Sequence, residues 1–310
     1  MTEGKMELEI KDIRKSFGEN EILHGISFKV KSGQALGLLG RNGAGKTTAI
    51  RILMDVFHAN SGQILLDGAP FKAKNHKIGY LPEERGLYPK RTVTDQMIFL
   101  ARLRGMKSAD AQKNAALWLE RLGISEYAGR KLETLSKGNQ QKVQLAATLV
   151  ADPDIVILDE PFSGLDPVNS QVLKDVVSEL IKDGKIVIFS SHQMNYVEEF
   201  CDSIAIIHHG DIVLSGRLSD IKREYGRNRL MLSSLNYGLS ELEQKLTAEF
   251  ADVLSIVGKT KTALIMNKTE GVTTKDIMKR LIESDIEIDK FGSYEPSLGD
   301  IFVDKAGDEE

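Results

Sequence analysis

The chain has 310 residues, of which 41% are hydrophobic and 28% are charged, as is ordinary for a globular protein. This length suggests one large domain, or a large domain with a small one. The formal net charge of −4 gives no electrostatic argument for a nucleic-acid partner. The apolar runs 155–158 and 204–207 are far shorter than the roughly 20 residues of a membrane span. Because the first ten residues also lack a signal-peptide stretch, we expect a protein that starts and stays in the cytosol.

The first part of the chain has the pattern of antiparallel strands. Apolar and polar residues alternate over 7–37, on either side of a turn at residues 18–20, which predicts paired strands. From Leu36 onward an apolar run leads into a glycine-rich turn, and a helical stretch follows over 47–57. This change of character indicates that a strand–loop–helix unit begins there.

The middle of the chain combines a helical segment with buried strands. Residues 92–131 contain no strand-like run and show helical spacing, with Thr94 as the expected cap of the first helix. The runs 155–159 and 185–192 are apolar and β-branched, as in strands that helices cover on both faces. We therefore predict an α/β domain over 1–219, with a parallel-sheet core and a helical insertion at about 85–150.

After residue 219 the pattern changes again. Three strand-like runs and two helical stretches follow Leu230–Leu232, the first strand. The expected order is βαββαβ, the split βαβ or ferredoxin-like pattern. We therefore predict a smaller α+β accessory domain over 220–310.

A glycine-rich segment carries the strongest chemical signal. Residues 40–47 fit the pattern G-x-x-x-x-G-K-[ST] between an expected strand and an expected helix. Glycines let successive backbone N–H groups face one anion, and the helix adds its positive end. Lys46 would reach the β- and γ-phosphates and the Thr47 hydroxyl would bind Mg²⁺. The predicted nucleotide-binding residues of this loop are Gly40, Arg41, Asn42, Gly43, Ala44, Gly45, Lys46, Thr47 and Thr48.

Two acidic residues follow the buried strand 155–159. Asp159 ends this strand and Glu160 comes directly after it. We expect Asp159 to hold Mg²⁺ through water and Glu160 to polarise the attacking water. Together with the glycine-rich loop, they predict a Mg²⁺-dependent ATPase with Lys46 and Glu160 among its catalytic residues.

The segment 135–142 narrows the family. It reads LSKGNQQK and resembles the LSGGQ signature of ABC ATPases, with Lys137 and Asn139 as departures. Ser136 and Gly138 are retained; in the family, this pair contacts the γ-phosphate of the ATP that the other subunit holds. The resemblance extends over residues 7 to about 218. It implies a P-loop ABC cassette with an antiparallel β subdomain.

Three more elements resemble parts of this family. Residues 163–166 look like the D-loop, and His192 looks like the switch histidine, a catalytic residue that bonds the γ-phosphate. Phe17 occupies the position of the aromatic residue that stacks on adenine, although a phenylalanine of the core is the competing interpretation. Glu83 stands where the family usually has a metal-binding glutamine. A glutamate there would bind Mg²⁺ but repel the γ-phosphate, so hydrolysis would be slower or differently gated.

The run PEERGLYP and the tail SYEPSLGDIFV look like those of Nat-type (sodium-extrusion) exporter ATPases. This resemblance implies an exporter subunit on the inner face of the cell membrane, with Na⁺, a drug, a lipid or a peptide as cargo. It also implies a separately encoded permease and a homodimer, or a heterodimer with a second ABC ATPase. We expect Glu84, Arg85, Leu87 and Tyr88 to touch the permease.

Other interpretations are weaker. A soluble ABC ATPase acting on DNA or ribosomes usually has two cassettes or a long coiled coil, whereas this chain has one cassette and no basic stripe. Residues 267–270 superficially resemble a guanine-reading motif of GTPases, but they lie in the accessory domain. That domain could be a passive cap, a ligand sensor or a dimerising module, and fold analogy cannot decide among these.

Overall fold

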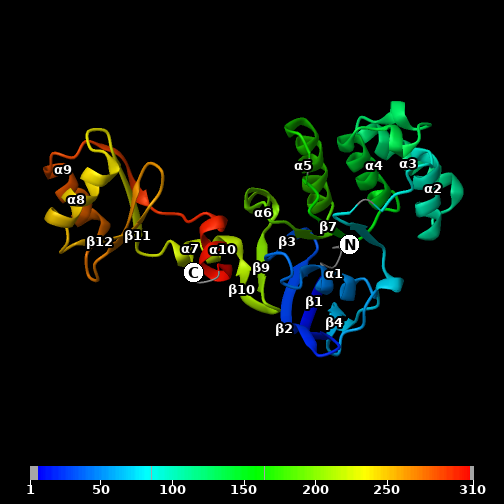
Figure 1. Ribbon diagram of the computed structural model, residues 1–310, viewed down its shortest axis with the longest axis horizontal. Helices are drawn as coiled ribbons and strands as arrows, with labels where there is room; N and C mark the ends of the chain where they lie inside the picture. The colour runs from blue at the N-terminus through cyan, green and yellow to red at the C-terminus, as the bar shows by residue number, and fades with distance from the viewer. Residues whose placement is uncertain (1–5, 85, 164, 308–310) are drawn as a thin grey trace, which may run out of the picture. The chain divides into compact units, whose positions relative to one another are not determined.

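The computed structural model describes residues 6–84, 86–163 and 165–307. The chain separates into two compact units (Figure 1), one running to Leu218 and including the residues from Phe302 onward, the other formed by Ser219–Ile301. The boundary after Leu218 falls one residue before the predicted boundary. The residues from Phe302 onward, which were predicted to belong to the accessory domain, group with the first unit. Each unit has its own hydrophobic core.

The first unit begins with a four-stranded antiparallel sheet in the order β2-β1-β4-β5. β1 and β2 form the predicted hairpin, in which Glu7 pairs with Lys31 and Phe17 with Asn20. Gly18 in the connecting turn has φ 62°, a left-handed conformation that glycine adopts without strain. The strands are β1 (Glu7–Phe17), β2 (Asn20–Lys31), β4 (Ser61–Leu66) and β5 (Ala69–Pro70).

A six-stranded sheet in the order β10-β9-β3-β8-β7-β6 forms the centre of this unit. Its strands from β9 to β6 are parallel, and β10 is antiparallel to β9. All residues of β7 and β8 are buried, which confirms the predicted parallel core. The strands are β3 (Gln34–Leu39), β6 (Ile78–Leu81), β7 (Ile155–Asp159), β8 (Ile186–Ser190), β9 (Ser203–His208) and β10 (Asp211–Arg217); the accompanying helices are α1 (Lys46–Leu53), α5 (Pro167–Lys182) and α6 (Met194–Phe200).

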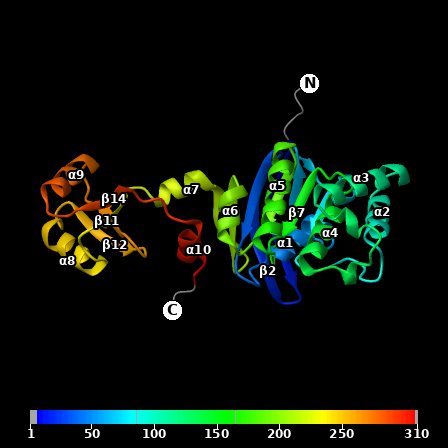
Figure 2. The same cartoon turned by 90° about the horizontal axis from the view of Figure 1, so that it is seen from above.

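Helices α2 (Val93–Leu103), α3 (Ser108–Arg121) and α4 (Lys137–Leu149) form a separate group in the first unit (Figures 1 and 2). The predicted cap of α2 was wrong by two residues. Thr92 is the cap, because its side chain accepts a hydrogen bond from Asp95 N at 3.2 Å. Thr94 lies inside the first turn, where its backbone N–H donates to Ala128 O.

The second unit has the predicted order of elements. Its four antiparallel strands lie in the order β12-β13-β11-β14, which is the arrangement of a ferredoxin-like sheet. Leu242, Leu246 and Ile277 of its helices are buried against this sheet. The elements are α7 (Leu218–Tyr225), β11 (Arg229–Ser234), α8 (Leu239–Glu249), β12 (Leu254–Lys259), β13 (Leu264–Lys268), α9 (Thr274–Glu283), β14 (Ile288–Ser293) and α10 (Leu298–Ala306), the last of which crosses the division at Ile301.

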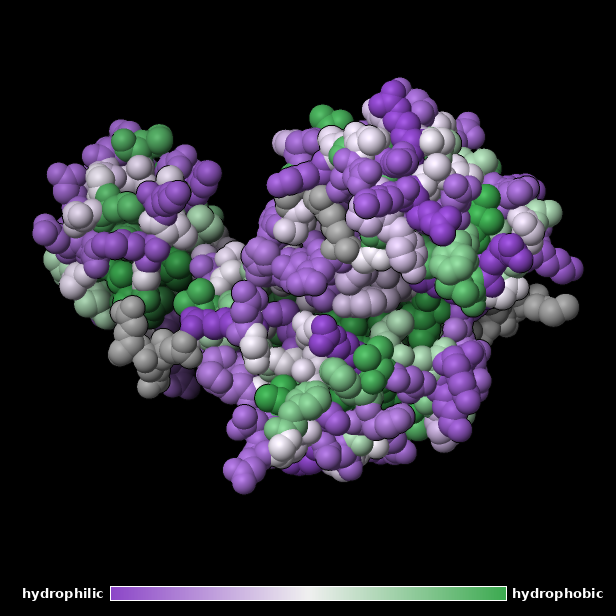
Figure 3. Space-filling view, turned by 45° about the vertical axis from the view of Figure 1, so that its right-hand side comes forward, coloured by the Kyte–Doolittle hydropathy of each residue, from purple (hydrophilic) through white to green (hydrophobic). Residues whose placement is uncertain are grey.

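The surface is mainly hydrophilic on the face shown in Figure 3, with hydrophobic residues gathered in small patches. Throughout the described part of the chain, every helix is too short or too polar to span a lipid bilayer.

Candidate nucleotide-binding and hydrolysis site

The glycine-rich loop connects the carboxyl end of β3 with the start of α1. Gly40 has φ 156° and Gly45 has φ 114°, so both use conformations that other residues rarely adopt. A Cβ atom on Gly40 would lie 2.4 Å from the carbonyl oxygen of Ile207, and one on Gly45 would lie 2.6 Å from Leu23 Cδ2. The loop is therefore packed against neighbouring segments at Gly40 and Gly45, two positions where only glycine fits.

Lys46 is the first residue of α1, and its ammonium group folds back over the loop. Nζ donates to the carbonyl oxygens of Gly40 at 2.6 Å and Arg41 at 3.2 Å. Burial lowers the pKa of Lys46, although the negative charges of Glu160, Asp159 and Glu83 oppose this shift. A phosphate group would replace these neutral carbonyls with charged oxygens and so stabilise the ammonium ion.

The loop forms one wall of a cavity of about 210 Å³. This cavity brings together residues from the ends of β3, β6, β7 and β8, as expected where parallel strands end at one edge of a sheet. Gly40 and Ala44 belong to the loop but do not line it. The lining residues are Ile22, Arg41, Asn42, Gly43, Gly45, Lys46, Thr47, Thr48, Glu83, Asp159, Glu160 and His192.

Asp159 is a buried carboxylate with hydroxyl groups beside it. Its side chain is 6% exposed and accepts a hydrogen bond from the Tyr80 hydroxyl at 3.3 Å. Burial raises the pKa of Asp159. Burial and this neighbouring carboxylate raise the pKa of Tyr80 to about 12, so the phenol stays protonated and can donate. Tyr80 was not among the site residues predicted from the sequence.

The oxygen atoms around Asp159 fit a hard cation. Ser190 pairs with Asp159 across β7 and β8, and its buried hydroxyl lies close enough to that carboxylate to oppose the rise in the carboxylate's pKa. Thr47 and Glu83 supply further oxygens along the cavity wall. The described ranges contain no cluster of three or more His, Cys, Asp or Glu side chains placed to hold a metal ion. This sparse set suits Mg²⁺, which takes one or two protein ligands and completes its shell with phosphates and water.

Glu160 is held in a strained and well-oriented position. It has φ 48°, which is uncommon for a residue with a side chain, and it is 7% exposed. Its Oε1 lies 2.8 Å from both the backbone N and Nδ1 of His192. Its Oε2 accepts a hydrogen bond from the Ser191 hydroxyl at 3.2 Å. The structure thus joins two predicted catalytic residues directly and adds Ser191, which the sequence analysis missed.

Phe17 lies outside the cavity lining, at the end of β1. Its side chain is 45% exposed, so the alternative interpretation as a core residue is wrong. The ring makes an edge contact with Phe57, with 5.3 Å between centroids, and Lys15 Nζ lies 4.9 Å from its centroid. Stacking of adenine on Phe17 stays a prediction.

The signature residues also lie outside the cavity lining. Ser136 caps α4 and accepts a hydrogen bond from Asn139 N at 3.3 Å. Gly138 lies against α5, because an added Cβ would be 2.8 Å from Asn169 Nδ2. Asp166 of the predicted D-loop caps that helix through Asn169 N at 2.9 Å. Gly164 of the same loop falls outside the described residues.

Gln144 on α4 connects the signature helix with the Glu83 segment. It is buried, and its Nε2 donates to the carbonyl oxygens of Pro82 at 3.1 Å and Glu84 at 3.2 Å. Gln141, one turn earlier, donates to Pro161 O at 3.2 Å. The sequence analysis missed both residues, since a polar residue in a helix carries no sign of its distant partner.

Two family models match the chain. The ABC transporter model covers residues 23–163, and the model of the DrrA1-3-like ATP-binding protein C-terminal domain covers residues 216–306. A solved structure described as an ATP-binding subunit of an ABC transporter aligns with a TM-score of 0.65 and 28% identity, over 77% of this chain and 99% of that chain. The predicted fold class is confirmed: a P-loop ABC cassette with a smaller C-terminal domain.

Named relatives point the same way. The chain is 40% identical over 307 residues to the ABC transporter ATP-binding protein YhaQ of Bacillus subtilis (strain 168), covering 97% of this chain and 98% of that protein. It is 34% identical over 224 residues to the ABC transporter ATP-binding protein NatA of the same organism, covering 69% and 91%. The chain therefore belongs to the ABC transporter ATP-binding proteins, whose cassette hydrolyses ATP to power transport, and it carries a DrrA-like C-terminal domain.

Proposed function

We propose that this chain is the Mg²⁺-ATP-hydrolysing subunit of an exporter, acting as a dimer on a separately encoded permease at the inner face of the cell membrane. The observation that supports this most strongly is the single cavity lined by Lys46, Thr47, Asp159, Glu160 and His192. The direction of transport, out of the cell, is inferred from the resemblance to Nat-type exporter ATPases. The cargo depends on the permease and stays open among ions, drugs, lipids and peptides.

The roles of the side chains follow from their positions. Lys46 and the backbone of the loop bind the phosphates, while Thr47, Asp159 and Glu83 would hold Mg²⁺. The bound ion would neutralise the charge that develops on the transferred phosphoryl group. Glu160 orients and polarises the attacking water, and its carboxylate is kept in place by Ser191 and His192.

The dimer is proposed because the signature residues lie away from their own chain's cavity. Ser136 is exposed at the start of α4, and it does not line the cavity that holds Lys46. A second cassette facing this one would bring its Ser136 to the γ-phosphate. Such an arrangement is two-fold symmetric, since each chain completes the other's site.

A groove in the helical group is the proposed permease contact. It has a volume of about 290 Å³ and is lined by Tyr88, Arg91, Asp95, Gln96 and Phe99. Tyr88 and Phe99 are 52% and 47% exposed, as aromatic anchors of an interface need to be. Buried Gln96 uses its oxygen to accept from Tyr88 N at 3.2 Å.

Gln96 also leaves one polar group beside the groove unsatisfied. Its buried Nε2 has no hydrogen-bond partner among the described residues, which is costly in the folded state. Of the residues expected to touch the permease, Tyr88 lines this groove, whereas Glu84 and Leu87 do not. Arg85 lies outside the described residues.

The dimer is tested with Glu160→Gln, which should bind ATP without hydrolysing it. We expect this variant to form dimers with Mg²⁺-ATP in sedimentation velocity experiments, and adding Ser136→Arg to block them sterically. Ser125→Arg, at another exposed position of the helical group, is the control and should leave dimerisation intact. An ATP-dependent dimer that tolerates Ser136→Arg would contradict the proposed arrangement.

The permease contact is tested by co-purification with the membrane protein encoded beside this chain. Phe99→Asp should abolish it, because the charge would be desolvated in an apolar contact. Leu117→Asp, at a 52% exposed position on α3, should not. Equal recovery with both variants would contradict the contact. Failure of vanadate-sensitive ATPase activity to rise with any membrane partner would contradict the transport role itself.

A further inference from the structure

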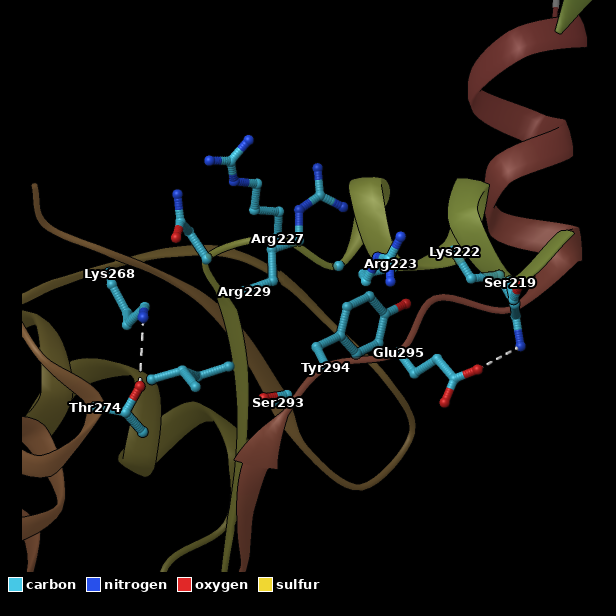
Figure 4. Close-up of a pocket in the computed structure, with 13 residues that line it drawn as sticks. Ser219, Lys222, Arg223, Arg227, Arg229, Lys268, Thr274, Ser293, Tyr294 and Glu295 are labelled. Atoms are coloured by element: carbon cyan, nitrogen blue, oxygen red, sulfur yellow. Dashed lines mark hydrogen bonds and ion pairs between the residues drawn. The ribbon is translucent and has the colours of Figure 1, made fainter. Parts of the chain in front are cut away.

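A second cavity lies within the C-terminal unit. It has a volume of about 600 Å³, within the range of small-molecule sites. Its charged residues come from α7, the segment that follows it, the start of β11, the end of β13 and the segment after β14: Lys222, Arg223, Arg227, Arg229, Lys268 and Glu295. Figure 4 shows these side chains together with Tyr294.

The cations are concentrated in this cavity against the charge of the whole unit. Residues 219–301 contain 12 Lys and Arg and 14 Asp and Glu, so the unit as a whole is slightly acidic. Five of the 12 basic residues line the cavity, but only one of the 14 acidic residues does. Four of the five basic residues come from the segment 222–229 and the fifth, Lys268, from β13. Clefts lined mainly by one sign of charge concentrate ions of the other.

The basic side chains fall into two groups. Lys222 binds Glu295 at 3.0 Å, and Arg223 binds Asp220 at 3.0 Å. Lys268 donates to the hydroxyl of Thr274 at 3.3 Å; Figure 4 shows this contact and the one between Lys222 and Glu295 as dashed lines. Among the described residues, Arg227 and Arg229 form no salt bridge, so the middle of the cavity keeps a surplus of positive charge.

The backbone of the cavity is fixed by close packing. A Cβ on Gly226 would lie 2.5 Å from the carbonyl oxygen of Tyr294, so the segment after α7 runs tightly against the end of β14. Tyr294 N donates to Arg229 O at 3.0 Å, and the Tyr294 hydroxyl donates to Asp300 at 3.0 Å. The backbone at Arg229 and the ring of Tyr294 are therefore held by short contacts before any ligand arrives.

We propose that this cavity is a binding site for a small polyphosphorylated anion. Guanidinium groups match the oxygen geometry of phosphates and bind them in pairs of hydrogen bonds. Several cations around one cavity suit a ligand with more than one phosphate, and the ring of Tyr294 offers an apolar face to an attached organic group. The only carboxylate in the lining is Glu295, which is occupied by Lys222, so the site binds and does not hydrolyse.

The phosphates could belong to a soluble metabolite or to a lipid headgroup, and the experiment separates these sources. Full-length protein, with its nucleotide site filled by a non-hydrolysable ATP analogue and Mg²⁺, is titrated calorimetrically with inorganic tripolyphosphate. In parallel, it is sedimented with phosphatidylglycerol vesicles and with neutral phosphatidylcholine vesicles. The parent is compared with Arg227→Ala/Arg229→Ala and with the control Lys259→Ala/Lys279→Ala. The control also removes two positive charges from this unit, at side chains that are 61% and 77% exposed.

We expect one tripolyphosphate to bind per chain, with affinity reduced about tenfold for each arginine removed and unchanged in the control. Vesicle binding that depends on the same arginines, without tripolyphosphate binding, would assign the phosphates to lipid. The proposal is overturned if neither probe binds, or if the arginine and control variants bind equally. ATPase activity is measured on every variant, so a defect of the nucleotide site is recognised separately.

Discussion

The nucleotide cavity and the proposed phosphate-binding cavity of the C-terminal unit differ in volume and in the charges that line them. The first is small, about 210 Å³, and has the acidic residues Glu83, Asp159 and Glu160 opposite the cations Arg41 and Lys46. The second is about 600 Å³ and has five cations with a single carboxylate. The nucleotide cavity is lined by the backbone of the glycine-rich loop and by acidic side chains, whereas the C-terminal cavity is lined mainly by long basic side chains.

This difference in lining charge distinguishes a site that hydrolyses its ligand from a site that only binds one. A carboxylate near a phosphate is repulsive unless a metal ion or a reacting water lies between them, so acids in a phosphate site indicate a reaction. The C-terminal cavity lacks this arrangement and has the charges that holding an anion requires. Changes to acids should therefore alter turnover in the first cavity, and changes to cations should alter affinity in the second.

The largest expected effect follows from removing the negative charge of Glu160. Glu160→Gln keeps the shape of the side chain and can still contact His192, but it cannot accept a proton from water. We expect the turnover number to fall by about 10²- to 10⁴-fold, with ATP affinity nearly unchanged, in a steady-state phosphate-release assay. Tripolyphosphate binding in the C-terminal cavity should be the same as in the parent. A turnover within threefold of the parent (about 0.7 kcal/mol) would remove Glu160 from the reaction.

Asp159→Asn should have opposite effects on activity and stability. Loss of the buried charge weakens the hold on Mg²⁺, and we expect Mg²⁺-dependent turnover to fall by about 10²-fold. Burial raises the pKa of Asp159 above its unfolded value, so the folded state binds the extra proton between these two values. Stability from this group is therefore lost as pH rises through that window.

The effect of Asp159→Asn on stability is measured by urea unfolding without nucleotide. Asp159→Asn should have a higher free energy of unfolding than the parent at neutral pH, and the gap should close at acid pH. Asp175→Asn, on α5 outside the cavity, is the control and should show no such gap. A lower free energy of unfolding for Asp159→Asn at neutral pH would mean that the Tyr80 hydrogen bond outweighs the cost of burial.

Gly40→Ala should damage the backbone cradle specifically. The new Cβ would lie 2.4 Å from a backbone carbonyl oxygen at φ 156°, so the loop must shift. We expect ATP affinity to fall about tenfold and the free energy of unfolding to fall by about 1–3 kcal/mol, measured by nucleotide titration and urea unfolding. Gly105→Ala, with φ 86° and open space around it, should lose stability only. Unchanged ATP affinity in Gly40→Ala would show that the loop tolerates the shift.

Sequence reasoning predicted the two sites unequally, for a physical reason. The glycine-rich loop is one continuous segment, and Asp159, Glu160 and His192 each follow an apolar strand, so their meeting at one sheet edge could be foreseen. The order of the C-terminal elements was also evident from their periodicity. The cap of α2 was misplaced because Thr92 and Thr94 are equally good caps locally, and packing of Thr94 N against Ala128 O decides between them.

The basic cavity was not predicted from the sequence. Four of its five cations lie within residues 222–229, but no local pattern places them beside Lys268. Only the pairing of β11 with β13 and β14 brings them together. Lys268 had been noted only as part of an apparent guanine-reading motif. Likewise, the link from Gln144 to the Glu83 segment depends on α4 packing beside β6, which local sequence does not reveal.

The smallest expected effect concerns Glu83, the least usual acid of the nucleotide cavity. The backbone on both sides of it is held by Gln144, through Pro82 O and Glu84 O, so Glu83→Gln should change charge without moving the segment. The neutral amide would bind Mg²⁺ less tightly and repel the γ-phosphate less. We expect the Mg²⁺ concentration for half-maximal activity and the turnover number both to rise, by about two- to fivefold.

A Mg²⁺ titration of ATPase activity at fixed ATP measures both quantities in one experiment. Glu84→Gln is the matched control, because this neighbouring glutamate is exposed but does not line the cavity. If Glu83→Gln behaves like Glu84→Gln, Glu83 is a spectator and the acids of the cavity reduce to Asp159 and Glu160. If the Mg²⁺ dependence and the turnover number change only in the Glu83 variant, Glu83 contributes both to metal binding and to repulsion of the γ-phosphate. The C-terminal cavity has no such opposing effects, because its carboxylate is paired with Lys222.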